Sequence, residues 1–229
     1  MDIQEKHPHP NPMIRMLVMG ISDGAIGMMV LVASLTALHG TPNLIIITGA
    51  AYILSGIVSM AITTYLFLMS ERHTLQNDVL RETLEIETEP EEEKQELRDI
   101  FKAEGYSPEA AEKLLETVTR DKDTWLRAQL KFELNKTIEQ TTVTIKQDII
   151  GVAVGFGISS AILLPFILGI SDALIAAMIT GTGILFVTTA TNLSLHINDW
   201  KHGVKATLLV VILVIAIYLT VRMTGIGFA

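Results

Sequence analysis

Cysteine is absent from the 229-residue chain, which excludes disulfides and thiolate metal sites. The sequence also lacks an HExxH zinc motif, a Walker phosphate loop and a cysteine nucleophile, and no Ser-His-Asp set stands out. We therefore expect that the chain is not an enzyme.

Charge is scarce over most of the sequence. Of the 25 acidic residues, 18 lie between Glu71 and Glu133, and the formal net charge is −8. A soluble globule spreads charge over its whole surface, so this segregation predicts membrane segments joined to one acidic aqueous segment. An acidic segment repels phosphate, which argues against a nucleic-acid partner.

Long apolar runs fill the rest of the chain, and a helix needs about 20 such residues to cross a bilayer. Five runs reach this length: Ile14–Leu38, Leu44–Met69, Ile149–Leu168, Asp172–Leu193 and Val204–Val221. We predict an all-α integral membrane protein in which five transmembrane helices contact the lipid bilayer. We also expect a cytoplasmic helical metal-binding insert between helices 2 and 3.

The predicted domain boundaries follow these runs. Residues 1–13 form an N-terminal tail, 14–69 form transmembrane helices 1 and 2, 70–145 form the acidic insert, and 146–229 form helices 3–5. Basic residues in short loops mark the cytoplasmic side of a membrane protein. Those in this chain place the N-terminus and the insert in the cytoplasm: Lys6, Arg15, Arg72, Lys201 and Lys205. We expect a cell membrane, with a vacuolar membrane as the alternative.

The insert shows several helix boundary signals. Its first part, Ser70–Thr88, is expected to continue the second transmembrane helix. Pro90 suits the first turn of a new helix, and Gly105 suits the position just after its end. Ser107-Pro108 begins another helix, and Asp123 is expected to cap a last one.

Asp23 lies within the apolar run MLVMGISDGAIGMMVLVASL, which extends from Met16 to Leu35. A charged side chain near the middle of a bilayer costs about 3 kcal/mol or more, so such residues face a protein interior, a water path or a cation. Asp23 therefore predicts an ion pathway. The adjacent Gly24 is small enough to let another helix approach closely.

Glutamates in the insert recur at helical spacing. Glu82 and Glu85 share one helix face, Glu93 and Glu96 share another, and Glu133 lies near the end of the last predicted helix. A hard divalent cation would relieve the repulsion between such carboxylates. The alternative is a solvated acidic surface, which is common for helices rich in glutamate. Met60 is a soft potential ligand, although a membrane methionine usually serves packing.

Taken together, these features resemble the vacuolar iron transporter family of Fe(II)/Mn(II) exporters. The resemblance covers nearly the whole chain and rests on Asp23-Gly24, Ser59-Met60, the glutamate-rich insert, GYSPEAAEKL after the second insert helix, Leu163-Leu164-Pro165, and the order of the five spans.

The resemblance implies a homodimer whose ion path runs between the subunits, lined by the first span. It also implies Fe(II) or Mn(II) as the bound ion that is exported from the cytoplasm, with no organic cofactor. Export would be proton antiport if Asp23 is reprotonated from outside. Asp23 and Met60 match the membrane metal site of the family. The glutamates that match its cytoplasmic metal-binding domain are Glu82, Glu85, Glu93, Glu96 and Glu133.

The chain departs from the family pattern at two positions. Thr64 replaces a membrane glutamate, which puts proton coupling in doubt. Gln129 replaces a methionine, and its harder amide oxygen shifts preference from Fe(II) toward Mn(II) or another hard ion. A metal-responsive membrane receptor or scaffold without transport is the alternative function.

Overall fold

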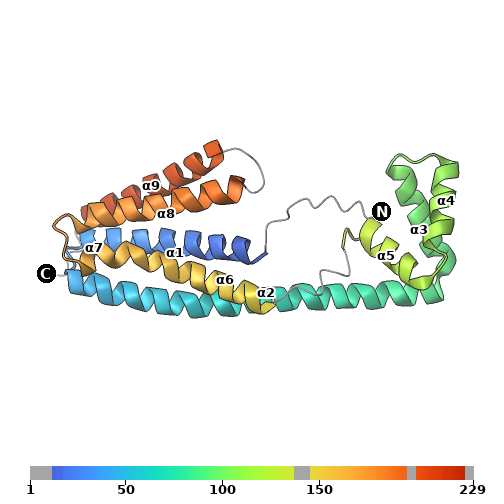
Figure 1. Cartoon of the computed structure of the whole chain (residues 1–229), viewed down its shortest axis with the longest axis horizontal. Coiled ribbons are helices and arrows are strands. Elements are labelled where there is room, and N and C mark those ends of the chain that lie inside the picture. The colour runs from blue at the N-terminus through green and yellow to red at the C-terminus, as the bar shows by residue number, and fades with distance from the viewer. Residues whose placement is uncertain (1–11, 137–144, 195–199, 225–229) are drawn as a thin grey trace, which may run out of the picture. The chain divides into compact units, whose positions relative to one another are not determined.

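The computed structural model describes residues 12–136, 145–194 and 200–224, and every regular element among them is helical (Figure 1). This confirms the all-α class for the described residues. The chain divides into two compact units. Unit 1 contains Met1–Tyr65 and Ile145–Ala229, and unit 2 contains Leu66–Thr144.

Most of the apolar helices belong to unit 1. They are α1 (Pro12–Ala37), the first part of α2 (Pro42–Thr88), α6 (Ile145–Ile158), η2 (Ser159–Leu163), α7 (Leu164–Ile167), α8 (Ala173–Ser194) and α9 (Trp200–Met223). Four stretches are long and apolar enough to cross a membrane: Met13–Ala37, Pro42–Thr88, Ile145–Ile167 and Gly203–Met223. The described apolar part of α8, Ala173–Thr189, is shorter. Four of the five expected spans therefore meet this criterion.

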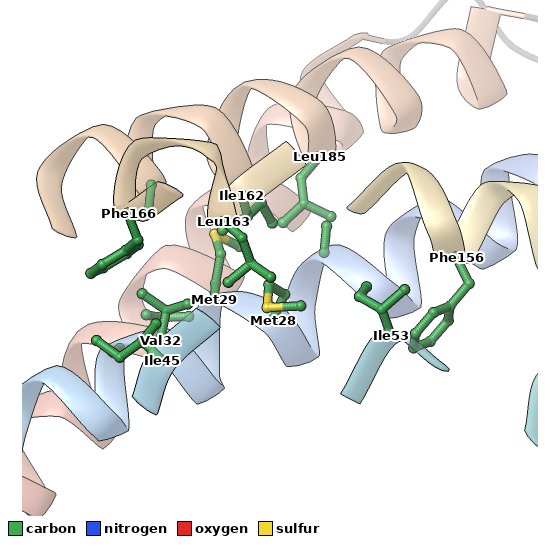
Figure 2. Packing of buried hydrophobic residues seen from close by; sticks show 14 residues of the cluster. Met28, Met29, Val32, Ile45, Ile53, Phe156, Ile162, Leu163, Phe166 and Leu185 are labelled. Atoms are coloured by element: carbon green, nitrogen blue, oxygen red, sulfur yellow. The ribbon is translucent and has the colours of Figure 1, made fainter. Parts of the chain in front are cut away.

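The core of unit 1 is built around α1. Met28, Met29 and Val32 on this helix are at most 1% exposed, and Figure 2 shows them among apolar side chains from α2, η2 and α8. Helices α1 and α6 approach each other through glycines. A Cβ atom on Gly20 would fall 2.2 Å from the carbonyl oxygen of Val152, and one on Gly155 would fall 2.2 Å from that of Leu17. Small residues therefore allow backbone-to-backbone packing within the chain.

The third expected span is present as Ile145–Ile167, but it is not one continuous α-helix. After α6 the chain makes the 3₁₀ segment η2 and then the short helix α7. Pro165 lies in the first turn of α7. Its ring has no N–H to donate and would clash with a carbonyl four residues earlier, so a regular α-helix cannot pass through it undisturbed.

Unit 2 contains the second part of α2, which continues without interruption to Thr88 as expected. It also contains α3 (Pro90–Ala103), α4 (Pro108–Val118) and α5 (Lys122–Phe132). A separate apolar core joins them, with Leu97, Phe101 and Ala111 at most 1% exposed.

The predicted boundaries in unit 2 are largely confirmed. Gly105 has φ +95°, and Tyr106 N donates to Phe101 O, which closes a Schellman cap after α3. Ser107 caps α4 by accepting from Ala110 N. The expectation for α5 was wrong by two residues, because Asp121 and not Asp123 is the N-cap. Asp121 accepts from Thr124 N, whereas Asp123 lies inside the first turn.

Candidate metal site

Three glutamates of unit 2 converge on one point. Glu82 comes from α2, Glu93 from α3, and Glu133 from the C-terminal cap of α5. One carboxylate oxygen from each lies within 4.8 Å of the other two. We refer to Glu82, Glu93 and Glu133 as the carboxylate cluster.

The helices direct two of these carboxylates inward. Glu82 lies one turn before Ile86, and Glu93 lies one turn before Leu97, and both of these apolar residues belong to the unit 2 core. The faces that bury Ile86 and Leu97 therefore also bury the glutamates, which are 0% and 5% exposed. A solvated acidic surface does not account for this burial, because charged groups are rarely buried without a partner.

Two polar neighbours contact the cluster. Arg81 Nη2 donates to Glu82 Oε1 at 2.8 Å, and Gln129 Nε2 donates to Glu93 Oε2. Within the described part of the chain, Glu82 Oε2 and Gln129 Oε1 are buried and accept no hydrogen bond. Nearly all buried acceptors in folded proteins have a partner, so these two oxygens make the cluster a candidate cation site.

Repulsion within the cluster changes proton affinity. The pKa of Glu133 is raised from 4.5 to about 7, first by partial burial of its carboxyl group and then by the charges of Glu82, Glu96 and Glu93. The pKa of Glu93 is also raised, chiefly by burial, although the hydrogen bond from Gln129 opposes the rise. A bound divalent cation would reverse these effects, because it favours the ionised carboxylates.

Glu85 and Glu96 lie outside this group. Glu85 is half-exposed and its Oε2 lies 3.6 Å from Arg81 Nε, whereas Glu96 is exposed. Both still add negative charge at Glu93 and raise its pKa. Of the five glutamates predicted in unit 2, the structure thus brings three together and leaves two at the periphery.

In unit 1, Asp23 on α1 and Met60 on α2 each lie within one turn of a glycine that packs against Phe156 of α6. A Cβ atom on Gly24 would fall 3.0 Å from the backbone oxygen of Phe156, and one on Gly56 would fall 2.1 Å from the ring of the same residue. Asp23 precedes Gly24, and Met60 lies one turn beyond Gly56 on α2. Asp23 is nevertheless exposed in the single chain, and Met60 is half-buried.

Two charged residues with unexpected surroundings were not singled out from the sequence. Arg81 forms an ion pair with Glu82. Its place directly before Glu82 in the sequence could have predicted this contact. Asp148 on α6 is 2% exposed, although it flanks an apolar run where a solvated position would be expected.

Comparisons with known proteins agree on one family. Residues 14–222 match the model of the VIT family. Vacuolar iron transporter 1 of Oryza sativa subsp. japonica is 29% identical over 184 residues, which cover 80% of this chain and 72% of the relative. The Arabidopsis thaliana protein of the same name is 26% identical over 186 residues, which cover 80% of this chain and 74% of the relative. Vacuolar iron transporter 2 of Oryza sativa subsp. japonica is 30% identical over 130 residues, which cover 57% of this chain and 53% of the relative.

These relatives and the four long apolar helices support a multi-pass membrane protein. The resemblance suggested by Asp23-Gly24 and the glutamate-rich insert is thereby confirmed. The family match spans all the described helices except the first two residues of α1 and the last residue of α9. The chain belongs to the VIT family.

Proposed function

We propose that this chain transports a divalent metal cation, Fe(II) or Mn(II), out of the cytoplasm. The observation that carries the proposal is the carboxylate cluster, in which three oxygens lie within 4.8 Å of one another and two of the glutamates are buried. Carboxylate oxygens at this spacing suit a hard divalent cation. The names of the relatives, vacuolar iron transporters, support iron as one such ion.

In the proposed mechanism, unit 2 is the cytoplasmic metal-binding domain and α8 completes a set of five spans. The carboxylate cluster collects ions, with Glu85 and Glu96 adding negative charge at its edge. The ions then pass to Asp23 and Met60 in the membrane. Asp23 must be ionised to bind a metal, so protons compete with the ion at this position.

The exposure of Asp23 supports a homodimer. An exposed carboxylate on an apolar helix costs about 3 kcal/mol or more in a bilayer, and a second copy over this face would enclose it in a polar path. The glycines of α1 do not support dimerisation, because Gly20 packs against α6, and Gly24 against α6 and η2, of the same chain. The dimer proposal therefore rests on Asp23 and on the family.

Energy coupling is the open step of this mechanism. A membrane potential of 100 mV, negative inside, opposes efflux of a divalent cation by about 4.6 kcal/mol. Thr64 is 5% exposed and lies one turn from Met60, so the position where the family resemblance expects a glutamate faces inward here without a carboxylate. Asp23 is then the residue proposed to exchange a proton for the ion.

A receptor or scaffold is the second candidate function. The absence of a carboxylate at Thr64 favours it, because a protein that binds metal without moving it needs no membrane proton carrier. In that case the cluster would bind ions as described, and Asp23 would have no part in the response.

Ion flux into proteoliposomes separates the two candidates. The full chain is reconstituted with an ion-sensitive dye inside, and Fe(II), Mn(II), Co(II), Mg(II) and Ca(II) are compared with and without a pH gradient. Asp23→Asn is the test variant. Asp172→Asn is its matched control. Asp23 and Asp172 each end a Gly-Ile-Ser-Asp sequence, but Asp172 is exposed in the turn before α8.

We expect Fe(II) or Mn(II) flux that Asp23→Asn abolishes and that Asp172→Asn leaves within a factor of about two. Dependence on the pH gradient would establish proton coupling through a residue other than Thr64. Metal binding without flux in the unmodified chain would contradict transport and favour the receptor.

A further inference from the structure

Asp148 is a buried carboxylate that the mechanism above does not use. It lies in the first turn of α6 and is 2% exposed. The start of α6 lies beside the start of α1, because a Cβ atom on Gly151 would fall 2.9 Å from the carbonyl oxygen of Met13. An aspartate in the first turn stabilises a helix by attracting its free N–H groups, but an exposed side chain does this equally well. The burial of Asp148 therefore needs a separate explanation.

The surroundings of Asp148 provide no paired cation. Arg15 on α1 acts on it through its charge, but Arg15 is exposed, and the two form no ion pair within the described part of the chain. Lys146, on α6 itself, is also exposed. A carboxylate buried in apolar surroundings needs either a cation beside it or a proton on it. Carboxylates of this kind in membrane segments often belong to proton relays.

The packing of α2 shows what lies opposite Asp148. Three contacts give one antiparallel register between α2 and the segment formed by α6 and η2: Gly49 with Leu163, Gly56 with Phe156, and Ile57 with Gly157. Asp148 lies about two turns before Phe156, and Thr64 lies about two turns after Gly56. The register therefore sets Asp148 opposite Thr64.

Thr64 faces the interior at this level. It is 5% exposed, whereas Thr63 and Tyr65 on either side of it are exposed. The interior between α2 and α6 thus has a carboxylate on the α6 side and only a hydroxyl on the α2 side. Asp23 lies about 15 Å further along α1 than Met13, so Asp148 and Asp23 are separate acidic positions along one direction of the bundle.

We propose that Asp148 is a proton carrier of the ion exchange. This inference rests on the proposed function of the chain as an exporter. The carboxyl group takes a proton that comes from the outer side and releases it to the cytoplasm when a cation arrives, and only its O–H bond forms and breaks. Each cycle then exports one positive charge fewer than it would without Asp148.

Counting protons and cations on the same vesicles tests this role. The full chain is reconstituted, and potassium with valinomycin sets the membrane potential. Uptake of radioactive Mn(II), or of Fe(II) without oxygen, is measured together with the pH reported by a dye inside. Asp148→Asn and Asp148→Ser remove the carboxylate, Asp148→Glu retains it, and Asp148→Asn combined with Thr64→Glu moves it to α2. Asp172→Asn, at an exposed position before α8, is the matched control.

We expect Asp148→Asn and Asp148→Ser to move one proton fewer per cation than the unmodified chain. The final cation ratio across the membrane should then depend more steeply on the potential, by about tenfold for each 60 mV. Asp148→Glu, Asp172→Asn and the double variant should keep the proton count of the unmodified chain. A purely structural role would lower both fluxes in proportion and leave the count unchanged, which would overturn the proposal.

The results also separate this proposal from the function on which it rests. If the unmodified chain moves neither Mn(II) nor Fe(II), both proposals fail. If it moves a cation and the proton count is the same with Asn as with Asp at position 148, only the carrier role of Asp148 is wrong. Asp148→Ser gives the same comparison if Asp148→Asn does not fold.

Discussion

At the scale of single residues, partial burial and nearby charges both set the charge state of Glu133. Its side chain as a whole is exposed, yet partial burial of the carboxyl group and the charges of Glu82, Glu96 and Glu93 raise its pKa to about 7. The folded chain therefore holds this proton more tightly than the unfolded chain does. In the metal-free protein the resulting stabilisation is present at low pH and is lost as the pH rises through about 7.

Metal binding should have the opposite pH dependence. An ion must displace the proton from Glu133, so we expect Mn(II) affinity to fall by about fivefold between pH 7 and pH 6, and to change less between pH 8 and pH 9. Calorimetric titration of the full chain at each pH measures this slope. In Glu133→Gln the slope below pH 7 should be smaller, and an unchanged slope would assign the proton to another group.

Two glutamates of α2 differ in burial and should therefore differ in their effect on metal binding. Glu82 is 0% exposed and belongs to the cluster, whereas Glu87 is exposed and pairs with Lys122 at 3.0 Å. We expect Glu82→Gln to weaken Mn(II) binding at least tenfold and Glu87→Gln to leave it within a factor of about two. Equal effects in a direct titration would mean that general negative charge, and not the cluster, attracts the ion.

At the scale of helices, prolines, glycines and cap residues made much of unit 2 predictable. Pro90 and Gly105 define the two ends of α3 by local backbone chemistry, and Ser107 does the same for the start of α4. The start of α5 could not be chosen this way, because Asp121 and Asp123 are both chemically suitable caps. Which of them caps the helix depends on where the chain turns toward the core.

The same limit applies to the site. Spacing predicted that Glu82 and Glu85 share a helix face. Which of the two is buried depends on tertiary packing, because Ile86, one turn after Glu82, packs in the same core as Leu97 and Phe101. The resemblance supplied the set of five glutamates, and the fold separates three central ones from two at the edge. The break at Pro165, in contrast, follows from local chemistry, because proline has no N–H to donate and clashes with the preceding turn.

Close packing of α1 on α6 makes a prediction at this scale. A Cβ atom on Gly155 would fall 2.2 Å from a backbone oxygen of Leu17, whereas one on Gly183 of α8 would meet nothing within 4 Å. Gly155→Ala should therefore lower the thermal unfolding temperature of the detergent-solubilised chain by several degrees. Gly183→Ala is the control and should leave it unchanged or slightly higher, because alanine favours helix. A similar temperature for both variants would contradict this close contact.

At the scale of the whole molecule, the absence of native cysteine permits a direct test of the dimer. Met19 is 48% exposed and lies one turn before Asp23, on the face proposed to meet a second copy. Ile179 on α8 is 67% exposed and provides a control away from that face. Under mild oxidation in membranes, we expect Met19→Cys to form disulfide-linked dimers and Ile179→Cys to remain monomeric on non-reducing gels. The reverse pattern would place the interface on α8.

Unit 2 also contains an optical probe of its own ion content. Trp125 is 7% exposed, lies one turn before Gln129, and has Lys94 Nζ 5.7 Å from the centre of its ring. Its emission is therefore sensitive to the charge and polarity of the cluster wall. The chain has one other tryptophan, Trp200, so Trp200→Phe leaves a single fluorophore. Quenching by paramagnetic Mn(II) would then report filling and emptying of the site in real time, without any added label.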